Sequence, residues 1–153
     1  MQVNKTKIKK QVEVLEIFPK LLDEYWNLVD FMLREGLKYD GDPMNISDLK
    51  KLIKEGQMQL FVMFGSDDGI QYKVFGVCVT RITALPNFNQ CEVILLKGSQ
   101  RELWQDELAD TIEGLAKLSS CKRIAVHARP GWEPFLKTKG WGVKRYLYTK
   151  EIK

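Results

Sequence analysis

The stretch Ile94–Trp104, with the sequence ILLKGSQRELW, joins an apolar run to a helical pattern through a tight turn. A strand, a tight turn and a helix place backbone N–H groups where they can hold a phosphate. Ser99 is suited to cap the helix, and Glu102 on its first turn would repel a phosphate. Gly98 is the only glycine of the turn, whereas phosphate-binding loops usually have several. Side chains that can meet an anion are Lys97, Gln100 and Arg101. The turn is therefore either a phosphate-binding site or a simple connection between a strand and a helix.

The spacing of apolar residues predicts the elements that hold this turn. Alternating runs predict strands, and apolar residues that recur every three or four positions predict helices. The expected strands are Gln11–Ile17, Gln59–Phe64, Lys73–Thr83, Gln90–Lys97, Lys122–Ala128 and Lys144–Ile152, and the expected helices are 19–36, 45–56, 101–120 and 131–139. The order β-α-α-β-β-β-α-β-α-β predicts an α/β (α+β) fold with a mixed central β-sheet and helices on both faces.

The length and charge of the chain favour a small globular protein. A chain of 153 residues is long enough for a core of its own, and we expect a single domain over residues 1–153. Lys and Arg number 24 against 20 Asp and Glu, and much of the excess lies at the ends; residues 1–10 are expected to form a basic N-terminal arm. Solvated tails are the commoner role of such clusters and no nucleic-acid motif occurs, so nucleic acid is not an expected partner.

The cysteines and the apolar runs indicate where in the cell the protein is expected. Cys78, Cys91 and Cys121 are widely spaced and lie in or beside apolar runs. We therefore expect reduced core residues, no metal site and a cytoplasmic protein. The N-terminus has no apolar signal region, and no apolar run reaches membrane length, so no membrane association is expected.

The C-terminal part of the chain, CKRIAVHARPGWEPFLKTKGW…YTKEI, resembles the GNAT acyltransferase superfamily. The resemblance lies in a strand, a short helix, the Gly140-Trp141 pair and a last segment that ends in Lys-Glu-Ile. CEVILL also resembles the family's central strand, which carries a Glu near its start. The stretch with Arg129, Gly131 and Trp132 is most similar to divergent GNAT-like proteins of bacteriophages. The resemblance implies a GNAT-like fold that binds acyl-CoA where its central strands splay apart.

The resemblance also implies roles for single residues. Glu92 matches the family's general base, and its apolar alternation partners favour a partly buried carboxylate with a raised pKa; a surface or ion-paired glutamate is the alternative. The bulge that holds the pantetheine arm maps onto Leu95 and Leu96. The pyrophosphate turn maps onto Lys97, Gly98, Ser99, Gln100 and Arg101. The family's glycines there fall on Ser99 and Arg101, so the turn is shortened and eroded.

The remaining candidates lie around the short helix near the C-terminus. The tyrosine that protonates the leaving thiolate in the family maps onto Leu136, which cannot donate a proton. Arg129 is expected either to bind an anion at the cleft or to form a surface ion pair. Trp132 and Trp141 are expected either to line the acyl or substrate pocket or to serve as packing residues. His127, the single histidine, is expected to be a structural residue within its strand.

Two functions remain in view. The first is an N-acyltransferase that moves an acetyl or other acyl group from acyl-CoA, with acetyl-CoA as the expected cofactor, to an amine by direct transfer. The second is a catalytically inactive GNAT-fold protein that serves as a structural or interaction module, with a protein partner or in a phage particle. The expected location is the cytoplasm, or the host cytoplasm or virion if a phage encodes the protein.

Overall fold

The computed structural model describes residues 11–40 and 44–152; the predicted basic arm, residues 1–10, lies outside them. The strands are β1 (Gln11–Ile17), β2 (Gln59–Ser66), β3 (Lys73–Ala84), β4 (Asn89–Gly98) and β5 (Cys121–Val126). The α-helices are α1 (Leu22–Asp40), α2 (Ile46–Lys54), α3 (Gln105–Leu118) and α4 (Glu133–Thr138). Short 3-10 turns precede three of these helices: η2 (Pro19–Leu21), η3 (Arg101–Leu103) and η4 (Pro130–Trp132).

The five strands form one sheet in the order β1-β2-β3-β4-β5. The first four run antiparallel to their neighbours, and β5 pairs parallel to β4. A parallel pair needs a long crossover connection, and α3 supplies it. The mixed sheet predicted from the sequence is therefore confirmed.

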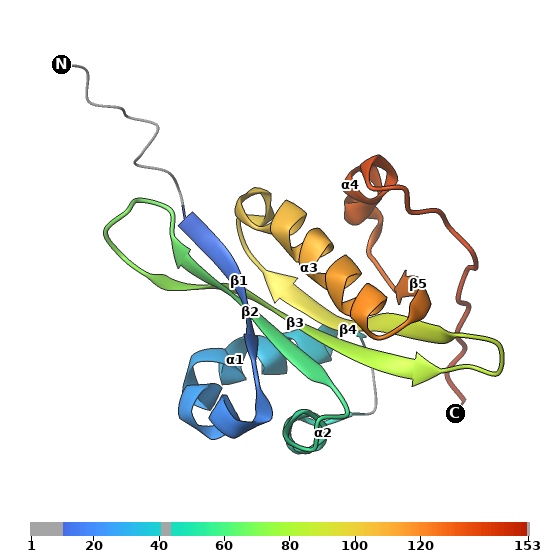
Figure 1. Cartoon of the computed structure of the whole chain (residues 1–153), viewed down its shortest axis with the longest axis horizontal. Coiled ribbons are helices and arrows are strands. Elements are labelled where there is room, and N and C mark those ends of the chain that lie inside the picture. Colours follow the sequence, from blue (N-terminus) through green and yellow to red (C-terminus); the bar gives the residue numbers. More distant parts are fainter. Residues whose placement is uncertain (1–10, 41–43, 153) are drawn as a thin grey trace.

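Helices cover both faces of the sheet, as predicted. Figure 1 shows α1 and α2 on one side and α3 and α4 on the other. On the first side, Leu33 of α1 and Leu49 of α2 are fully buried against sheet residues such as Val79. On the second side, Trp104 and Leu108 pack on sheet residues whose side chains lie on the opposite face of the sheet. Strand β4 lies between the two apolar clusters, because it contributes side chains to both.

Helix α1 does not end at Gly36, as its sequence pattern predicts, but continues to Asp40. Gly36 lies where α1 crosses β4: a Cβ atom at this position would be 2.8 Å from the Leu95 Cγ atom. The glycine therefore allows close helix–strand contact, and the helix passes through it.

The predicted last strand, Lys144–Ile152, is wrong. Residues 141–152 have no regular secondary structure, and the side chains of Tyr146, Leu147 and Tyr148 are 78%, 73% and 88% exposed. An alternating sequence specifies only which side chains would share a face. A strand forms when a neighbour takes its backbone hydrogen bonds and one face is buried, and this segment has neither within the described chain.

The end of β4 packs closely on its surroundings at Gly98. A Cβ atom at this position would lie 2.7 Å from the Phe75 carbonyl oxygen, 2.9 Å from the Gly76 Cα atom and 3.0 Å from the Trp104 ring. Two of these neighbours are backbone atoms that cannot move aside without disturbing the β3–β4 pairing. Gly98 therefore fixes where β4 ends and where the following turn begins.

We predict that Gly98→Ala lowers the free energy of unfolding by about 1–3 kcal/mol, because the added methyl group overpacks this contact. Gly114→Ala is the matched control, since Gly114 lies in α3 and no atom lies within 4 Å of an added Cβ. This control should stabilise the protein by about 0.5–1 kcal/mol through helix propensity. Urea unfolding of both variants measures the difference, and equal stability of the two would contradict the packing argument.

Candidate functional site

The candidate site begins where β4 and β5 separate. The two strands pair from Asn89 opposite Cys121 to Val93 opposite Val126. Beyond that pair β4 runs on to Gly98 and is bonded only to β3, while the chain after β5 turns away. Within the described residues, the second edge of this part of β4 has no strand partner. Its backbone N–H and C=O groups on that edge therefore remain able to bind another molecule.

A β-bulge lies at the point of separation. Val79 pairs with Leu95 and Thr80 pairs with Val93, so Ile94 is an extra residue on β4. The resemblance to GNAT proteins places the bulge at Leu95 and Leu96; the structure has it directly before them. A bulge bends its strand and re-aims the neighbouring side chains.

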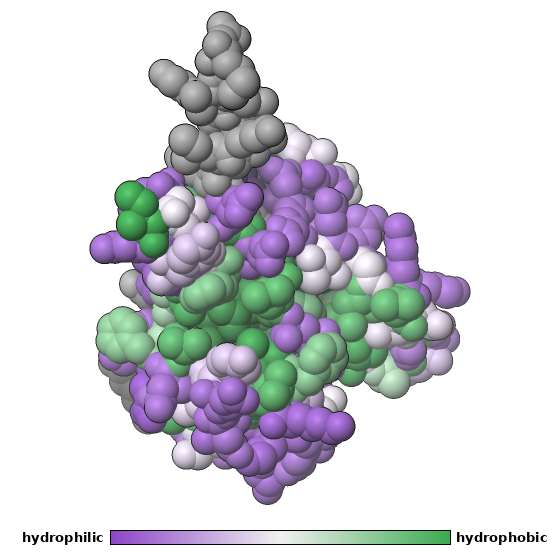
Figure 2. Space-filling model, turned by 60° about the vertical axis from the view of Figure 1, so that its left-hand side comes forward, coloured by the Kyte–Doolittle hydropathy of each residue, from purple (hydrophilic) through white to green (hydrophobic). Residues whose placement is uncertain are grey.

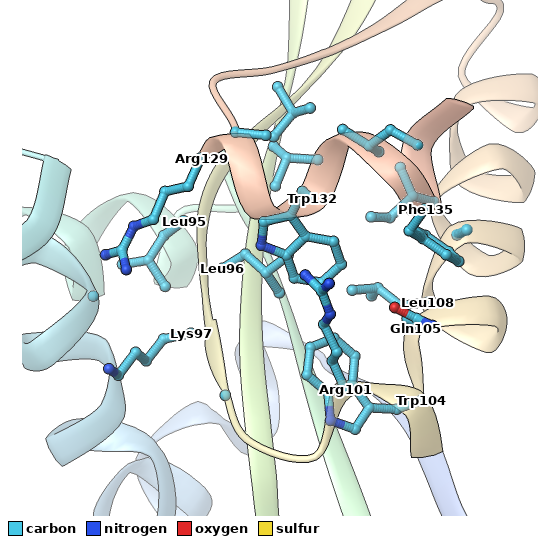
Figure 3. A pocket seen from close by; sticks show the side chains of 18 of the residues that line it. Leu95, Leu96, Lys97, Arg101, Trp104, Gln105, Leu108, Arg129, Trp132 and Phe135 are labelled. Atoms are coloured by element: carbon cyan, nitrogen blue, oxygen red, sulfur yellow. The ribbon is translucent and has the colours of Figure 1, made fainter. Parts of the chain in front are cut away.

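The separation opens onto a cavity of about 430 Å³. Its walls come from β4 beyond Glu92, the β4–α3 turn, the inner face of α3, the residues after β5, and α4 (Figure 3). All predicted site residues except Glu92 and Ser99 line it: Leu95, Leu96, Lys97, Gly98, Gln100, Arg101, Arg129, Trp132 and Trp141. The structure thus brings residues from both predicted regions, 95–101 and 129–141, to one cavity.

The β4–α3 turn has an unusual conformation at Gln100. This residue has φ 50° and ψ 49°, in the left-handed region that costs a non-glycine residue about 1–2 kcal/mol. Its side-chain Nε2 donates to Asp67 Oδ2 in the β2–β3 loop at 3.0 Å, so the side chain is held by that loop. The backbone amides of Gln100, Arg101 and Glu102 donate to no backbone carbonyl in the described part of the chain. The turn therefore presents backbone donors rather than the Gln100 side chain.

Aromatic side chains of the cavity lie beside the turn. The rings of Trp104 and Trp132 lie 6.2 Å apart, and Trp132 meets Phe135 edge-on at 6.1 Å. The Arg101 guanidinium lies 4.4 Å from the Trp132 ring centre, and its Nη2 donates to the Gly131 carbonyl at 3.0 Å. Figure 3 shows this side chain reaching from the turn to Trp132. Arg101 thus joins the β4 side of the cavity to η4.

Glu92 is an ion-paired residue rather than a cavity residue. Its Oε2 accepts from Arg81 Nη2 at 2.8 Å, and its Oε1 accepts from Gln90 Nε2 at 2.9 Å. Burial is the largest effect on the Glu92 pKa and raises it, but the hydrogen bonds and the charge of Arg81 together bring the pKa below its ordinary value of 4.5. The prediction of a raised pKa is therefore wrong, and the ion-paired alternative describes the residue. A lowered pKa makes a carboxylate a poorer base near neutral pH.

His127 and Gln105 are polar cavity residues that the sequence did not indicate as site residues. His127 is exposed, lines the cavity and lies directly after β5, because the strand ends at Val126 and not at Ala128 as predicted. Gln105 lines the cavity from the start of α3, and its side-chain Oε1 is buried without a hydrogen-bond partner. Neither position stands out in the sequence, because the assignment depends on where β5 leaves β4.

Phe135 and Leu136 line the cavity, and neither side chain has a proton to donate. Within residues 11–40 and 44–152, no group of three or more His, Cys, Asp or Glu side chains could hold a metal ion. The same part of the chain contains no helix that is long and apolar enough to cross a membrane.

The fold is also found in known proteins. No protein-family model matches the sequence, and no curated protein is similar to it in sequence. Solved structures do match. A protein described as a probable acetyltransferase superposes with a TM-score of 0.67 at 12% identity, covering 92% of this chain and 98% of its own.

Two further structures agree with that match. An aminoglycoside acetyltransferase from an uncultured soil metagenomic sample has a TM-score of 0.62 at 13% identity, covering 94% of this chain and 98% of its own. A GNAT family acetyltransferase of Staphylococcus aureus has a TM-score of 0.58 at 14% identity, covering 92% and 98%. At these identities the likeness concerns the fold: this chain has the fold of GNAT acetyltransferases.

We predict that Glu92→Gln lowers the free energy of unfolding at pH 7 by about 1 kcal/mol, through loss of the charge in the bond to Arg81. Because the folded-state pKa of Glu92 is lowered, its contribution is complete above the unfolded pKa and is lost as pH falls through the folded pKa. The difference between wild type and variant should therefore shrink below about pH 4. Urea unfolding from pH 7 to pH 3 measures it; a difference that grows in acid would contradict the ion pair.

Proposed function

We propose that this protein is an N-acyltransferase that moves an acetyl or other acyl group from acyl-CoA to an amine by direct transfer. The observation that carries the proposal is the separation of β4 and β5 beyond Val93 and Val126, which opens the exposed edge of β4 onto a cavity. The fold shared with acetyltransferases supports the same reaction.

The cavity residues fit acyl-CoA in two respects. The pantetheine arm carries amide groups, which match the backbone donors and acceptors on the edge of β4 around Leu95 and Leu96. The buried Oε1 of Gln105 has no partner in the described chain, so it offers an acceptor to an N–H group in the cavity. When bound, acyl-CoA would supply the activated acyl group as a thioester.

The charges around the turn also suit a phosphorylated ligand. Three cationic residues, Lys97, Arg101 and Arg129, line the cavity. The turn adds the amides of residues 100–102, whose N–H groups find no backbone acceptor in the described part of the chain. Because Gln100 is held by Asp67, we expect backbone amides and cationic side chains to bind the pyrophosphate.

The chemistry required of the chain is modest. Direct transfer needs an amine without its extra proton, an aligned thioester and a proton for the leaving sulfur. Leu136 cannot supply that last proton. We therefore expect the sulfur to take the proton that the attacking amine gives up as the new amide forms. Because one neighbour in fold acts on aminoglycosides, amines that carry several positive charges are the first acceptors to test.

A structural or interaction role is the second candidate. It is supported by the exposed apolar side chains of the segment 143–152, among them Val143, Leu147 and Ile152, which are 64%, 73% and 89% exposed. A partner protein is one way to cover them. Figure 2 shows one face of the molecule, and apolar side chains also gather in the middle of that face, between polar areas. Membership of a phage particle, with a location in the virion, remains a prediction that rests on sequence resemblance alone.

We predict that acetyl-CoA raises the melting temperature. A ligand that binds only the folded protein stabilises it by about 2.7 kcal/mol at a hundredfold excess over its Kd, which corresponds to about 5–10 °C for a domain of this size. Differential scanning fluorimetry with 1 mM acetyl-CoA measures the shift, and 1 mM AMP serves as a nucleotide control. An unchanged melting temperature with acetyl-CoA would exclude the transferase and leave the interaction module.

We also predict opposite effects of Gln105→Leu on stability and binding. Removing a buried acceptor without a partner should leave the stability of the free protein equal or higher, while the lost bond should weaken acetyl-CoA binding about fivefold to tenfold. Isothermal titration calorimetry and thermal unfolding measure the two effects. Full affinity in a stable variant would show that Gln105 does not contact the ligand.

A further inference from the structure

The proposed transfer requires a proton acceptor, and the structure offers few. An alkyl amine is protonated at neutral pH and must lose one proton before it can attack a carbonyl carbon. Glu92, the residue that the family resemblance favours, lies outside the cavity lining and is held by Arg81 and Gln90. The acceptor must therefore be sought among the residues that line the cavity.

Five ionisable side chains line this cavity. They come from β4 (Lys97), from η3 (Arg101 and Glu102) and from the segment after β5 (His127 and Arg129). The residues that α1, α3 and α4 contribute to the lining are uncharged: Gly36, Gln105, Leu108, Ala109, Ile112, Phe135 and Leu136. Ammonium and guanidinium groups keep their protons at neutral pH, so the three cationic residues cannot accept one. Only Glu102 and His127 remain.

Glu102 and His127 differ in where they lie along β4. His127 follows Val126, which forms the last β4–β5 pair with Val93, so it is the first residue beyond the point of separation. Glu102 follows the far end of β4, five strand residues and a turn away from Val93, a distance of about 16 Å along the strand alone. In the proposed binding mode the phosphates lie at the turn beside Glu102, and the arm runs back along β4 toward Val93. The acyl end then lies on the side of His127.

We infer that His127 is the proton acceptor of the transfer reaction, an inference that rests on the proposed function. Its imidazole takes one proton from the acceptor R–NH3+. The nitrogen lone pair then forms the C–N bond as the C–S bond breaks, and the sulfur takes the second amine proton and leaves as a thiol. The imidazolium, which is exposed at the cavity wall, returns its proton to water. Histidine is suited to this exchange because a nitrogen lone pair of the neutral imidazole accepts a proton and the charged ring gives it up again.

The single histidine of the chain permits a direct test. In a tag-free protein, the imidazole Hε1 resonance in the proton NMR spectrum belongs to His127 alone. Saturating acetyl-CoA should shift this resonance, because the acyl end is bound beside the ring. A thermal shift with acetyl-CoA but an unmoved resonance would overturn the inference and leave the proposed function standing. The absence of any thermal shift would instead remove the proposed function itself.

A variant pair gives the second readout. His127→Gln should keep the acetyl-CoA thermal shift but release thiol at least about a hundredfold more slowly with spermidine or a lysine peptide as probe amine. In wild type, kcat/KM should rise with pH, and the midpoint of this rise should equal the midpoint of the pH-dependent change in the His127 Hε1 chemical shift. The variant should lack the rise. Lys122→Gln, an exposed change on β5 outside the cavity lining, is the control and should keep both rate and profile. A His127→Gln protein with wild-type rate and profile would refute the role.

Discussion

The separation of β4 and β5 after the Val93–Val126 pair is the constraint on which the rest of the site depends. A strand inside a sheet normally has its N–H and C=O groups satisfied on both edges. From Leu95 to Gly98, β4 pairs with β3 and with no other strand of the described chain, and its other edge faces a cavity walled by α3 and α4. Backbone groups in such a position need water or a ligand as a partner. This single break in the sheet therefore creates both the space and the hydrogen-bonding surface of the candidate site.

The two apolar clusters hold this break open. On one face α1 presses on β4 at Gly36 and Leu95, and on the other Trp104 and Leu108 anchor the start of α3. Neither layer can close the gap without disturbing its own packing, because interiors are close-packed. The turn between β4 and α3 is tied at two further points, by Gln100 to Asp67 and by Arg101 to Gly131. The site is thus built on elements that the core already fixes.

The sequence predicts those features that depend on local pattern. Periodicity identifies the five strands of the sheet and the helices on its two faces, and the family resemblance leads to residues 95–101 and 129–141, most of which line the cavity. The same reasoning is wrong for 144–152, where an alternating pattern finds no neighbouring strand. Local pattern cannot reveal whether a partner edge is within reach.

The features that the sequence does not predict depend on register between strands. Glu92 meets Arg81 because the β3–β4 pairing sets them opposite each other, and a bulge of one residue changes every later pair on the strand. The role proposed for His127 likewise depends on β5 ending at Val126, and composition and spacing do not predict where that strand ends. Gln105 becomes notable only once its oxygen is seen buried without a partner.

The most direct test of this account is a titration of ¹⁵N-labelled protein with acetyl-CoA, followed by amide chemical shifts. If the ligand binds along the open edge of β4, the largest changes should fall on residues 94–102 and 127–129, and β1 and β2 should be nearly unaffected. Changes confined to residues 143–152, or none in the β4 edge at saturation, would contradict the claim that the separation of β4 and β5 forms the binding site.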